Sequence, residues 1–533
     1  MNFEELVKVA RKVENTTSRK EKIRLLADFF SRLNPEEAAI AARLLSGRIF
    51  PEYRDVALGV GWSTLREALS MKSTVKPLTT FYAKVTLKEL VSVLEKTANT
   101  SSRKKKISYI YSLISRMSDE EIEFLLRIIF GEVRIGANIG ILLETAAKLA
   151  HCKLEIVRRA YMYLSDIGDV ISTAIKGGCK ALETVKITLF RPVKPMLAAM
   201  AYTVEEILRE HGGKTALEYK YDGVRVQVHR KGRSVKVFSR RLSDITPYVP
   251  EAVSAAEKAG ADEFILDGEA VGVEGGKPIA FQEISRRIRR KKDKEKFFSR
   301  IPLHVYFFDI LYLNGRDLTS LKYIERRRIL ESICNEECLA RMTVTSNLNE
   351  ASSFYSSAIE AGHEGVMAKR LDSPYEPGTR GKHWLKLKAS DTIDCVIVAA
   401  EWGHGRRSGW LSDYHLAVYD EKNDRFVRVG KTYKGLTDAE FEEMTKRLLE
   451  LKVAEEDYIV YVKPEIVVEV EYAEIQRSPR YESGYALRFA RIKRIRWDRS
   501  PYDITTLEEL EKRYQAQHRR GASGENNSSR AAG

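Results

Sequence analysis

The spacing of apolar residues changes near residue 190, and this change divides the chain into parts with different folds. Up to that point apolar residues recur at helical spacing, as in the stretch LLADFFSRL from Leu25 to Leu33, which predicts a bundle of helices. After Arg191 the pattern alternates along Val224, Val226 and Val228, the two-residue period of a β-strand. An all-α part is therefore followed by parts built on sheets.

The middle of the chain predicts a mixed α/β (α+β) domain. The turn at Lys231 and Gly232 joins the strand that begins at Val224 to a second strand, so the two form a hairpin with Lys220 just before it. Further strands are predicted at Phe264–Val273, Leu303–Leu313, Gly365–Lys369 and Trp384–Lys388, with helical stretches between them.

From about residue 389 the chain predicts a small β-barrel, because short strand-like runs alternate with Gly-containing turns. The runs are Ile393–Trp402, Tyr414–Tyr419, Phe426–Val429 and Ile466–Tyr472. The tail from Gln515 to Gly533 is rich in Ser, Asn, Gly and Arg, a composition typical of disorder.

Composition favours an intracellular protein that binds a polyanion. Lys and Arg number 90 against 75 Asp and Glu, a net charge of +15, which favours a nucleic-acid partner over a merely soluble basic surface. The five cysteines are scattered with no Cys-x-x-Cys pair, which argues against a zinc site or a disulfide framework and for the reducing cytoplasm. The sequence shows no apolar leader and no long uncharged apolar run, so neither secretion nor membrane spanning is expected.

Lys220 lies at a predicted strand edge and is followed by Tyr221, Asp222 and Gly223. A lysine so placed is a candidate covalent nucleophile, with an acid two residues on and a glycine that leaves room for a ligand. Taken alone, a Lys-x-Asp-Gly run is equally compatible with a surface turn before a strand. The motifs that follow it decide between the two.

Those motifs share one arrangement, a charged or aromatic residue at the end of an apolar strand. They are Arg225, Arg240, Leu266-Asp267-Gly268-Glu269, Tyr306-Phe307-Phe308-Asp309, Glu364-Gly365-Val366-Met367-Ala368-Lys369 and Trp384-Leu385-Lys386-Leu387-Lys388. In this order they resemble the covalent nucleotidyltransferase superfamily of polynucleotide ligases and capping enzymes. The segment Gly131–Asn138 resembles the signature of the helical DNA-binding domain of archaeal and eukaryotic ATP-dependent DNA ligases.

The resemblance implies a helical DNA-binding domain at 1–190, an adenylation (nucleotidyltransferase) domain at 191–388 and an OB-fold barrel at 389–514, before the disordered tail at 515–533. It also implies that Lys220 displaces pyrophosphate from ATP to form lysyl-AMP. A lysine attacks phosphorus only when neutral, so burial and positive charge from Arg225, Lys386 and Lys388 are expected to lower its pKa.

The other nucleotide contacts are implied by the resemblance alone. Glu269 and Glu364 match positions near ribose and metal, and their hard oxygen ligands suit Mg²⁺ (or Mn²⁺). Phe308 matches the aromatic residue that stacks on adenine. The remaining residues that match positions lining the nucleotide pocket are Glu218, Arg240 and Arg380.

Three segments concern DNA and its partners. Gly136 and Gly140 beside Arg134 would let the backbone approach phosphates at a helix start, a sequence-independent contact suited to a nick, and the resemblance implies an encircling grip on duplex DNA. The basic run Arg286–Lys296 is either a set of phosphate contacts or a solvated helix face. Leu78–Tyr82 resembles a degenerate sliding-clamp motif without the expected glutamine, and the competing interpretation is aromatic core.

The segment Arg488–Asp498 resembles the last motif of the family, which is thought to swing over the nucleotide and orient the leaving pyrophosphate. Ala490 stands where the family often has proline, and Arg499 where it often has lysine. The second change keeps the charge but not the shape of the side chain. The roles of Arg499 and Asp498 therefore stay open.

The sequence thus predicts a monomeric, cytoplasmic (nucleoid-associated) ATP-dependent DNA ligase. It would seal nicks in duplex DNA through enzyme-lysyl-AMP and DNA-adenylate intermediates, in replication, repair and recombination. RNA ligases and capping enzymes would share Lys220 but lack the helical part, and an NAD-dependent ligase carries a cysteine zinc module that this sequence does not show. A non-catalytic scaffold would not need the complete series from Lys220 to Lys388. Use of ADP or GTP, the preferred metal and clamp binding stay open.

Overall fold

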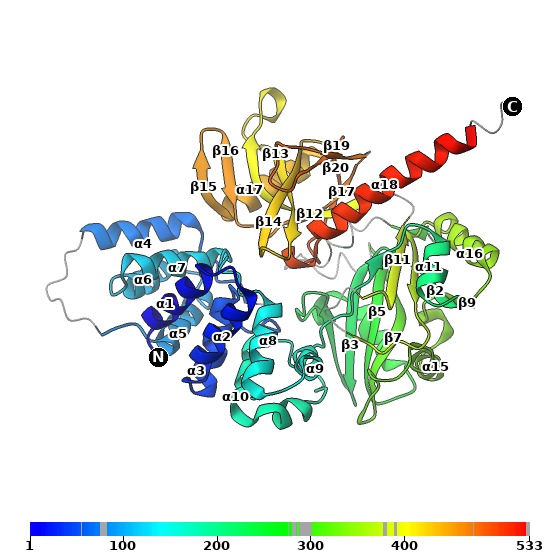
Figure 1. The fold of residues 1–533 in the computed structure, drawn as a ribbon, viewed down its shortest axis with the longest axis horizontal. Helices are drawn as coiled ribbons and strands as arrows, with labels where there is room; N and C mark the ends of the chain where they lie inside the picture. Colours follow the sequence, from blue (N-terminus) through cyan, green and yellow to red (C-terminus); the bar gives the residue numbers. More distant parts are fainter. Residues whose placement is uncertain are drawn as a thin grey trace.

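The computed structural model describes residues 1–533 apart from 55, 75–82, 275–276, 280–283, 285–286, 288–300, 377–380, 389–391, 473 and 529–533. Helices, a domain of two sheets and a β-rich domain follow one another along the chain (Figure 1), which confirms the predicted fold class. The clamp-like segment Leu78–Tyr82 lies outside the described residues. So do Arg380 and all of the basic run 286–296 except Arg287.

The N-terminal part is a bundle of helices around one apolar core. Its helices are α1 (Phe3–Glu14), α2 (Arg19–Phe30), α3 (Pro35–Leu45), α4 (Trp62–Thr74), α5 (Leu87–Ala98), α6 (Arg103–Ile114), α7 (Asp119–Phe130), α8 (Ile139–Ala150), α9 (Leu154–Leu164) and α10 (Ile167–Glu183). Most begin at a Ser, Thr or Asn that caps the first free amides, as Ser118 does for Glu121. Phe3, Phe30 and Phe124 are buried in the core that these helices share.

Cys152 and Cys179 form a disulfide, so the argument against disulfide bonding from the cysteine spacing is wrong for this pair. The two residues are 27 apart in sequence, but Gly177 and Gly178 leave the helical conformation inside α10. Gly178 has a φ of +59° and lies against the last residue of α8, Ala150. This break turns the end of α10 back to the loop after α8, a proximity that cysteine spacing alone does not reveal.

The central domain holds two largely antiparallel sheets. One has the order β1 (Ala199–Met200), β11 (Trp384–Lys388), β10 (Gly365–Lys369), β2 (Thr215–Tyr219), β9 (Met342–Thr345), and the other the order β4 (Ser234–Ser239), β3 (Val224–Lys231), β5 (Glu263–Glu274), β7 (Leu303–Leu313), β8 (Arg316–Asp317), with β6 (Lys277–Pro278) beside β5. The helices are α11 (Val204–Glu210), α12 (Pro250–Glu257), α15 (Tyr323–Ile333) and α16 (Leu348–Glu360). Leu217 of the first sheet and Val271 of the second share one buried cluster.

The polar positions of β3 are buried because they hold the segment that enters the domain. Gln227 accepts from the amide of Val193 at 2.7 Å and donates back to its carbonyl at 3.0 Å. His229 Nδ1 accepts from the amide of Phe190 at 3.0 Å. Both faces of this strand are therefore used, one for core and one for the connection to the helices.

The C-terminal domain holds a seven-stranded sheet, a separate pair of strands formed by β18 and β19, and two helices. Its strands are β12 (Thr392–Trp402), β13 (Leu411–Asp420), β14 (Arg425–Thr432), β15 (Lys452–Glu456), β16 (Ile459–Val462), β17 (Val467–Glu471), β18 (Glu474–Arg477), β19 (Tyr485–Arg488) and β20 (Arg491–Ile495), and its helices α17 (Asp438–Glu450) and α18 (Leu507–Ser528). Strand β12 pairs with β17 along its first half, with β16 along its second, and with β13 on its other edge. One long strand thus organises the whole domain.

Helix α18 continues to Ser528, where disorder was predicted from Gln515. Its start is fixed to the sheet, since Leu510 is fully buried and Gln517 accepts from the amide of Ile475 at 3.0 Å. Helix formation propagates from a fixed turn more easily than it starts, so the polar residues that follow continue the helix. Residues 529–533 lie outside the described part of the chain.

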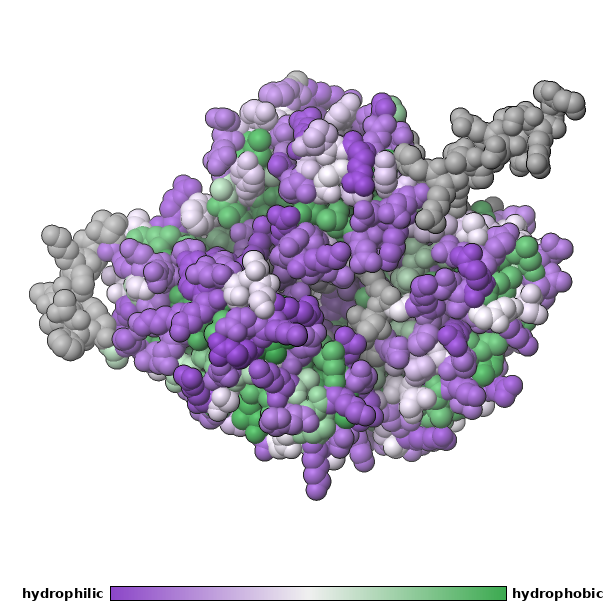
Figure 2. All heavy atoms as spheres, in the orientation of Figure 1, coloured by the Kyte–Doolittle hydropathy of each residue, from purple (hydrophilic) through white to green (hydrophobic). Residues whose placement is uncertain are grey.

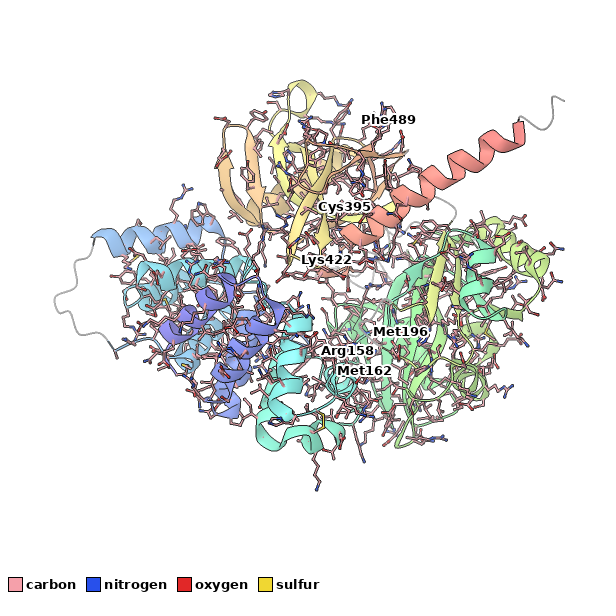
Figure 3. The ribbon with its side chains drawn as sticks, viewed as in Figure 1. Arg158, Met162, Met196, Cys395, Lys422 and Phe489 are labelled. Atoms are coloured by element: carbon pink, nitrogen blue, oxygen red, sulfur yellow. A yellow bond between two sulfur atoms is a disulfide. The ribbon has the colours of Figure 1, made fainter. Side chains whose placement is uncertain are left out.

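All three domains touch one another. Met162 of α9 and Met196 share a cluster where the helices meet the central domain (Figure 3), and Val453 of the C-terminal domain packs against the helical core. The face seen in Figure 2 is mostly hydrophilic, with apolar residues in small separate groups. Among the described residues, no helix is long and apolar enough to cross a membrane.

Candidate active site

Lys220 lies in the short loop between β2 and β3, as the sequence predicts. Its amide donates to the carbonyl of Gly365 at 2.9 Å, and its carbonyl accepts from the amide of Glu364 at 3.2 Å. Gly223 does not serve mainly to admit a ligand, because a Cβ there would lie 2.3 Å from the carbonyl oxygen of Ala270. This close approach fixes the loop against β5.

Lys220 lines a cavity of about 120 Å³ between the central and C-terminal domains. The structure brings together in its lining seven of the predicted residues, Glu218, Lys220, Arg225, Arg240, Glu269, Phe308 and Lys386. Sequence reasoning assigned no pocket role to several further lining residues, among them Met196, Lys369, Trp384, Arg496 and Asp503. Lys369 and Trp384 are end residues of two of the sequence motifs and could have been assigned from them. Met196 and Asp503 lie in segments that contain no recognisable motif.

One end of the cavity combines aromatic rings with a buried ion pair. Lys369 Nζ lies 2.6 Å from Glu218 Oε2 and 4.4 Å from the ring centroids of Phe308 and Trp384. Glu218, 2% exposed, also accepts from the hydroxyl of Tyr323. An aromatic face beside a fixed carboxylate can stack on a planar base and accept from its exocyclic amine.

Arg225 is less available as a free charge than its place in the sequence suggests. Its guanidinium makes a two-pronged contact with Asp267, at 3.0 and 2.7 Å, and donates to the carbonyl of Met196 at 2.7 Å. Asp267 therefore compensates the positive charge that was expected to act on Lys220. Arg225 still lines the cavity, and its guanidinium lies over the rings of Phe308 and Trp384.

Lys220 forms an ion pair with Glu364. Burial lowers the pKa of the Lys220 amine, and the nearby ammonium of Lys388 lowers it further, while Glu364 opposes both. Burial alone would raise the pKa of Glu364, but Lys220, Lys388 and Arg494 hold it well below its ordinary value. Burial and Lys388 thus favour the neutral form of the amine that a nucleophile requires, and the ion pair with Glu364 favours the charged form.

Glu269 is the other predicted metal ligand and lines the same cavity. Burial raises its pKa to about 7, against the opposing effect of Lys220 and Arg225. A buried carboxylate of this kind is stabilised by an added cation. Within the described residues no group of three or more His, Cys, Asp or Glu side chains converges, but Mg²⁺ often binds one or two carboxylates together with substrate phosphates, and the donor set fits that mode.

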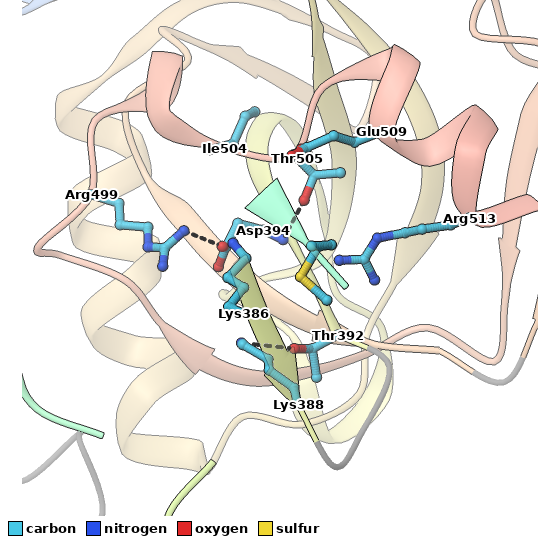
Figure 4. A pocket seen from close by; sticks show the side chains of 10 residues that line it. Lys386, Lys388, Thr392, Asp394, Arg499, Ile504, Thr505, Glu509 and Arg513 are labelled. Atoms are coloured by element: carbon cyan, nitrogen blue, oxygen red, sulfur yellow. Dashed lines mark hydrogen bonds and ion pairs between the residues drawn. The ribbon is translucent and has the colours of Figure 1, made fainter. Parts of the chain in front are cut away.

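A second, much smaller cavity of about 10 Å³ lies next to Lys386 and Lys388 (Figure 4). It offers room for about one water molecule. Arg499 forms an ion pair with Asp394 there, and burial and the charge of Arg499 lower the pKa of Lys386 well below its ordinary value. Asp498 forms a two-pronged contact with Arg496 at 2.9 and 2.8 Å, so both residues whose roles the sequence left open belong to ion pairs beside the site.

The predicted DNA contacts lie elsewhere, at the start of α8. Asn138 caps this helix by accepting from the amide of Ile141, and Gly136 has a φ of +68° that favours glycine. Gly140 lies in the first turn of the helix, and Arg134 is an exposed residue of the segment before it. This helix start faces the C-terminal domain, since Asn138 Nδ2 lies 3.5 Å from the carbonyl oxygen of Glu421.

A helical domain, a two-sheet domain with a buried lysine pocket and a β-rich domain that covers the pocket define a nucleotidyltransferase that acts on nucleic-acid ends. Comparison with known families agrees. The description "ATP dependent DNA ligase domain" matches residues 195–388, "ATP dependent DNA ligase C terminal region" matches 407–499, and "DNA ligase N terminus" matches 2–77 and 70–147. Similar proteins include DNA ligase 1 of Korarchaeum cryptofilum, 41% identical over 98% of this chain and 99% of that protein.

A DNA ligase of Thermococcus fumicolans is 40% identical over 97% of this chain and 99% of its own length. One of Archaeoglobus fulgidus is 37% identical over the same two shares, 97% and 99%. The chain therefore belongs to the family of ATP-dependent DNA ligases, enzymes that use ATP to join DNA strands.

Proposed function

We propose that Lys220 is the residue that carries AMP between ATP and a nicked duplex. Its neutral amine would attack the α-phosphorus of ATP, forming a P–N bond as pyrophosphate leaves. The 5′-phosphate at the nick would then attack the same phosphorus and release the lysine, and the 3′-hydroxyl would attack the 5′-phosphorus and release AMP. The observation that carries the proposal is the largely buried Lys220 amine, which lines a cavity between two domains and is paired with the carboxylate of Glu364.

The cavity supports an orientation for the nucleotide. Adenine would stack on Phe308 near the buried carboxylate of Glu218, as the rings and ion pair there allow. The phosphates would then lie toward Arg240, Lys386 and Lys388, with Arg380 as a further candidate. Burial and the charge of Arg499 lower the pKa of Arg240 to about 10, which favours an anion beside it.

Mg²⁺ (or Mn²⁺) would be held by the carboxylates of Glu269 and Glu364 together with the phosphates, and would neutralise phosphate charge. Arg134, Gly136 and Gly140 would contact the DNA backbone. We further propose the domain limits 1–190, 191–388 and 389–514, a monomeric, nucleoid-associated enzyme, duties in replication, repair and recombination, and a sliding clamp as partner of Leu78–Tyr82.

The test is intact mass of the protein after incubation with a divalent metal and, separately, ATP, GTP or NAD, followed by nicked duplex DNA. The expected result is one AMP adduct from ATP that maps to Lys220 and is lost as the nick closes. Lys220→Ala should form no adduct and seal no nick, yet bind nicked DNA as the wild type does. Lys214→Ala, which changes an exposed lysine before β2, should behave as wild type; sealing by Lys220→Ala would refute the role of Lys220.

A further inference from the structure

Glu469 of β17 is a buried carboxylate that no motif in the sequence singles out. It is 1% exposed and belongs to the C-terminal domain, yet its oxygens contact side chains from both sides of the domain boundary. Lys388, the last residue of β11, donates to it at 3.0 Å, and Thr392, the first residue of β12, donates at 2.5 Å. It also forms an ion pair with Arg494, which lies opposite it on the neighbouring strand β20.

Arg494 extends the contact from Glu469 into the candidate active site. Its Nε donates to Glu469, while Nη1 and Nη2 donate to Asp222 and Glu364. Glu364 in turn holds Lys220. Three carboxylates thus share one guanidinium, and its fixed planar fork can satisfy them only from one position.

The charges in this group balance in the arrangement observed. Asp222, Glu364 and Glu469 face Lys220, Lys388 and Arg494. A fourth cation, Arg496, lies 3.7 Å from Glu469 and is itself paired with Asp498. Burial would raise the pKa of Glu469, but Lys388 and Arg494 lower it to about 2. The carboxylate is therefore ionised. Removal of one member of a buried ionic group leaves its partners uncompensated.

We infer that Glu469 is a positioning residue for the reaction of Lys220 with ATP, which it serves by fixing Arg494 and Lys388 against the Lys220–Glu364 pair. The inference rests on the proposed role of Lys220. In this arrangement Lys220 is only 14% exposed and the segment that carries Arg496, Asp498 and Arg499 forms one wall of the cavity. A duplex end would have to displace this segment to reach Lys220, so we assign the arrangement to adenylation and not to the joining step.

The experiment measures two reactions of Glu469→Gln separately. Lysyl-AMP formation from ATP in a single turnover should be slower by about tenfold or more, the size of a coupling between contacting charged groups. Joining of a nick that already carries 5′-AMP bypasses the lysine and should stay within about twofold of wild type. Glu471→Gln, an exposed glutamate on the same strand, is the matched control and should leave both reactions unchanged.

A double-mutant cycle with Arg494→Lys identifies the path of the effect. If Glu469 acts through Arg494, the double variant should be no slower in adenylation than Arg494→Lys alone. Wild-type adenylation by Glu469→Gln, equal slowing of both reactions, or additive effects in the cycle would each overturn the inference. If even the wild-type protein formed no lysyl-AMP, the proposed role of Lys220 would fall first.

A milder variant covers the case in which Glu469→Gln does not fold. Thr392→Val removes the hydrogen bond to Glu469 and the one that Thr392 accepts from Lys388 at 3.3 Å, and keeps every charge. It should slow adenylation by about threefold or more, a fraction of what one hydrogen bond to a charged group contributes, without slowing the joining of the pre-adenylated nick. An unchanged adenylation rate in this variant would count against the inference.

Discussion

Single buried side chains determine both the chemistry of this chain and its sensitivity to acid. His229 is fully buried in β3, where Nδ1 accepts from the amide of Phe190 and Nε2 donates to Gln227. Only the neutral ring can do both, and burial lowers its pKa from 6.5 to about 3. Below pH 6.5 the unfolded chain therefore binds a proton at His229 that the folded chain does not bind. The free energy of unfolding falls as the pH falls toward 3.

His229→Leu should remove this contribution. The variant should be less stable than wild type at pH 7.5, because two hydrogen bonds are lost, but the difference in unfolding free energy should shrink by about 2 kcal/mol at pH 5. Denaturant unfolding at both pH values measures it. His404→Leu, at an exposed position, should show no such change, and a difference between His229→Leu and wild type that is independent of pH would contradict the assignment.

At the scale of elements, the loop that carries Lys220 is positioned by backbone packing. A Cβ on Gly223 would lie 2.3 Å from the carbonyl oxygen and 2.9 Å from the carbonyl carbon of Ala270, and β5 cannot yield because it is paired on both sides. Gly223→Ala should therefore displace Lys220 and slow lysyl-AMP formation by about 100-fold. Gly260→Ala is the control, since its Cβ would meet Ile333 at an ordinary 3.7 Å; equal rates in both variants would show that the loop tolerates the shift.

The Cys152–Cys179 disulfide closes a loop of 27 residues between α8 and α10. By the chain-entropy relation such a loop stabilises the folded state by about 3–4 kcal/mol. Cys152→Ser should lower the melting temperature of the helical domain, and dithiothreitol should lower that of the wild type by a similar amount without affecting the variant. Thiol titration of the denatured wild type should find three free thiols, Cys334, Cys338 and Cys395; five would mean that the bond does not form.

The elements that the sequence predicted well are those whose pattern is local. Gly365–Lys369 and Trp384–Lys388 coincide with β10 and β11, because a short apolar run that ends in a charged residue marks a buried strand reaching a cleft. What was missed depends on register and on distant segments. Asp267 compensates Arg225 across two neighbouring strands, and Glu469 meets Lys388 only because β12 pairs with β17. No spacing along the chain encodes either contact.

At the scale of the whole molecule, the three domains form a closed arrangement. The central domain meets the helices around Met162 and Met196, and meets the C-terminal domain through Arg494. The turn before β14 closes the third side: Glu421 accepts from Asn138, and burial raises the pKa of the half-buried carboxylate of Asp424 while Lys22 and Arg134 lower it. Arg134, a proposed phosphate contact, thus faces an acidic turn that DNA would have to displace.

Asp424→Lys should weaken this third contact. The variant sets a third cation beside Lys22 and Arg134, so the helical and C-terminal domains should separate in the absence of DNA, and the radius of gyration from small-angle scattering should rise. Nicked duplex should bind about tenfold more tightly at low salt, because a competitor for the cations is lost and one cation is gained, and the gain should shrink as salt increases.

Asp457→Lys is the control. It makes the same charge change at another positive-φ turn of this domain, where Asp457 is exposed. If both variants kept the wild-type dimensions and bound DNA equally well, the acidic turn would not compete with DNA, and the closed arrangement would be held by other contacts, such as the packing of Val453 against the helical core.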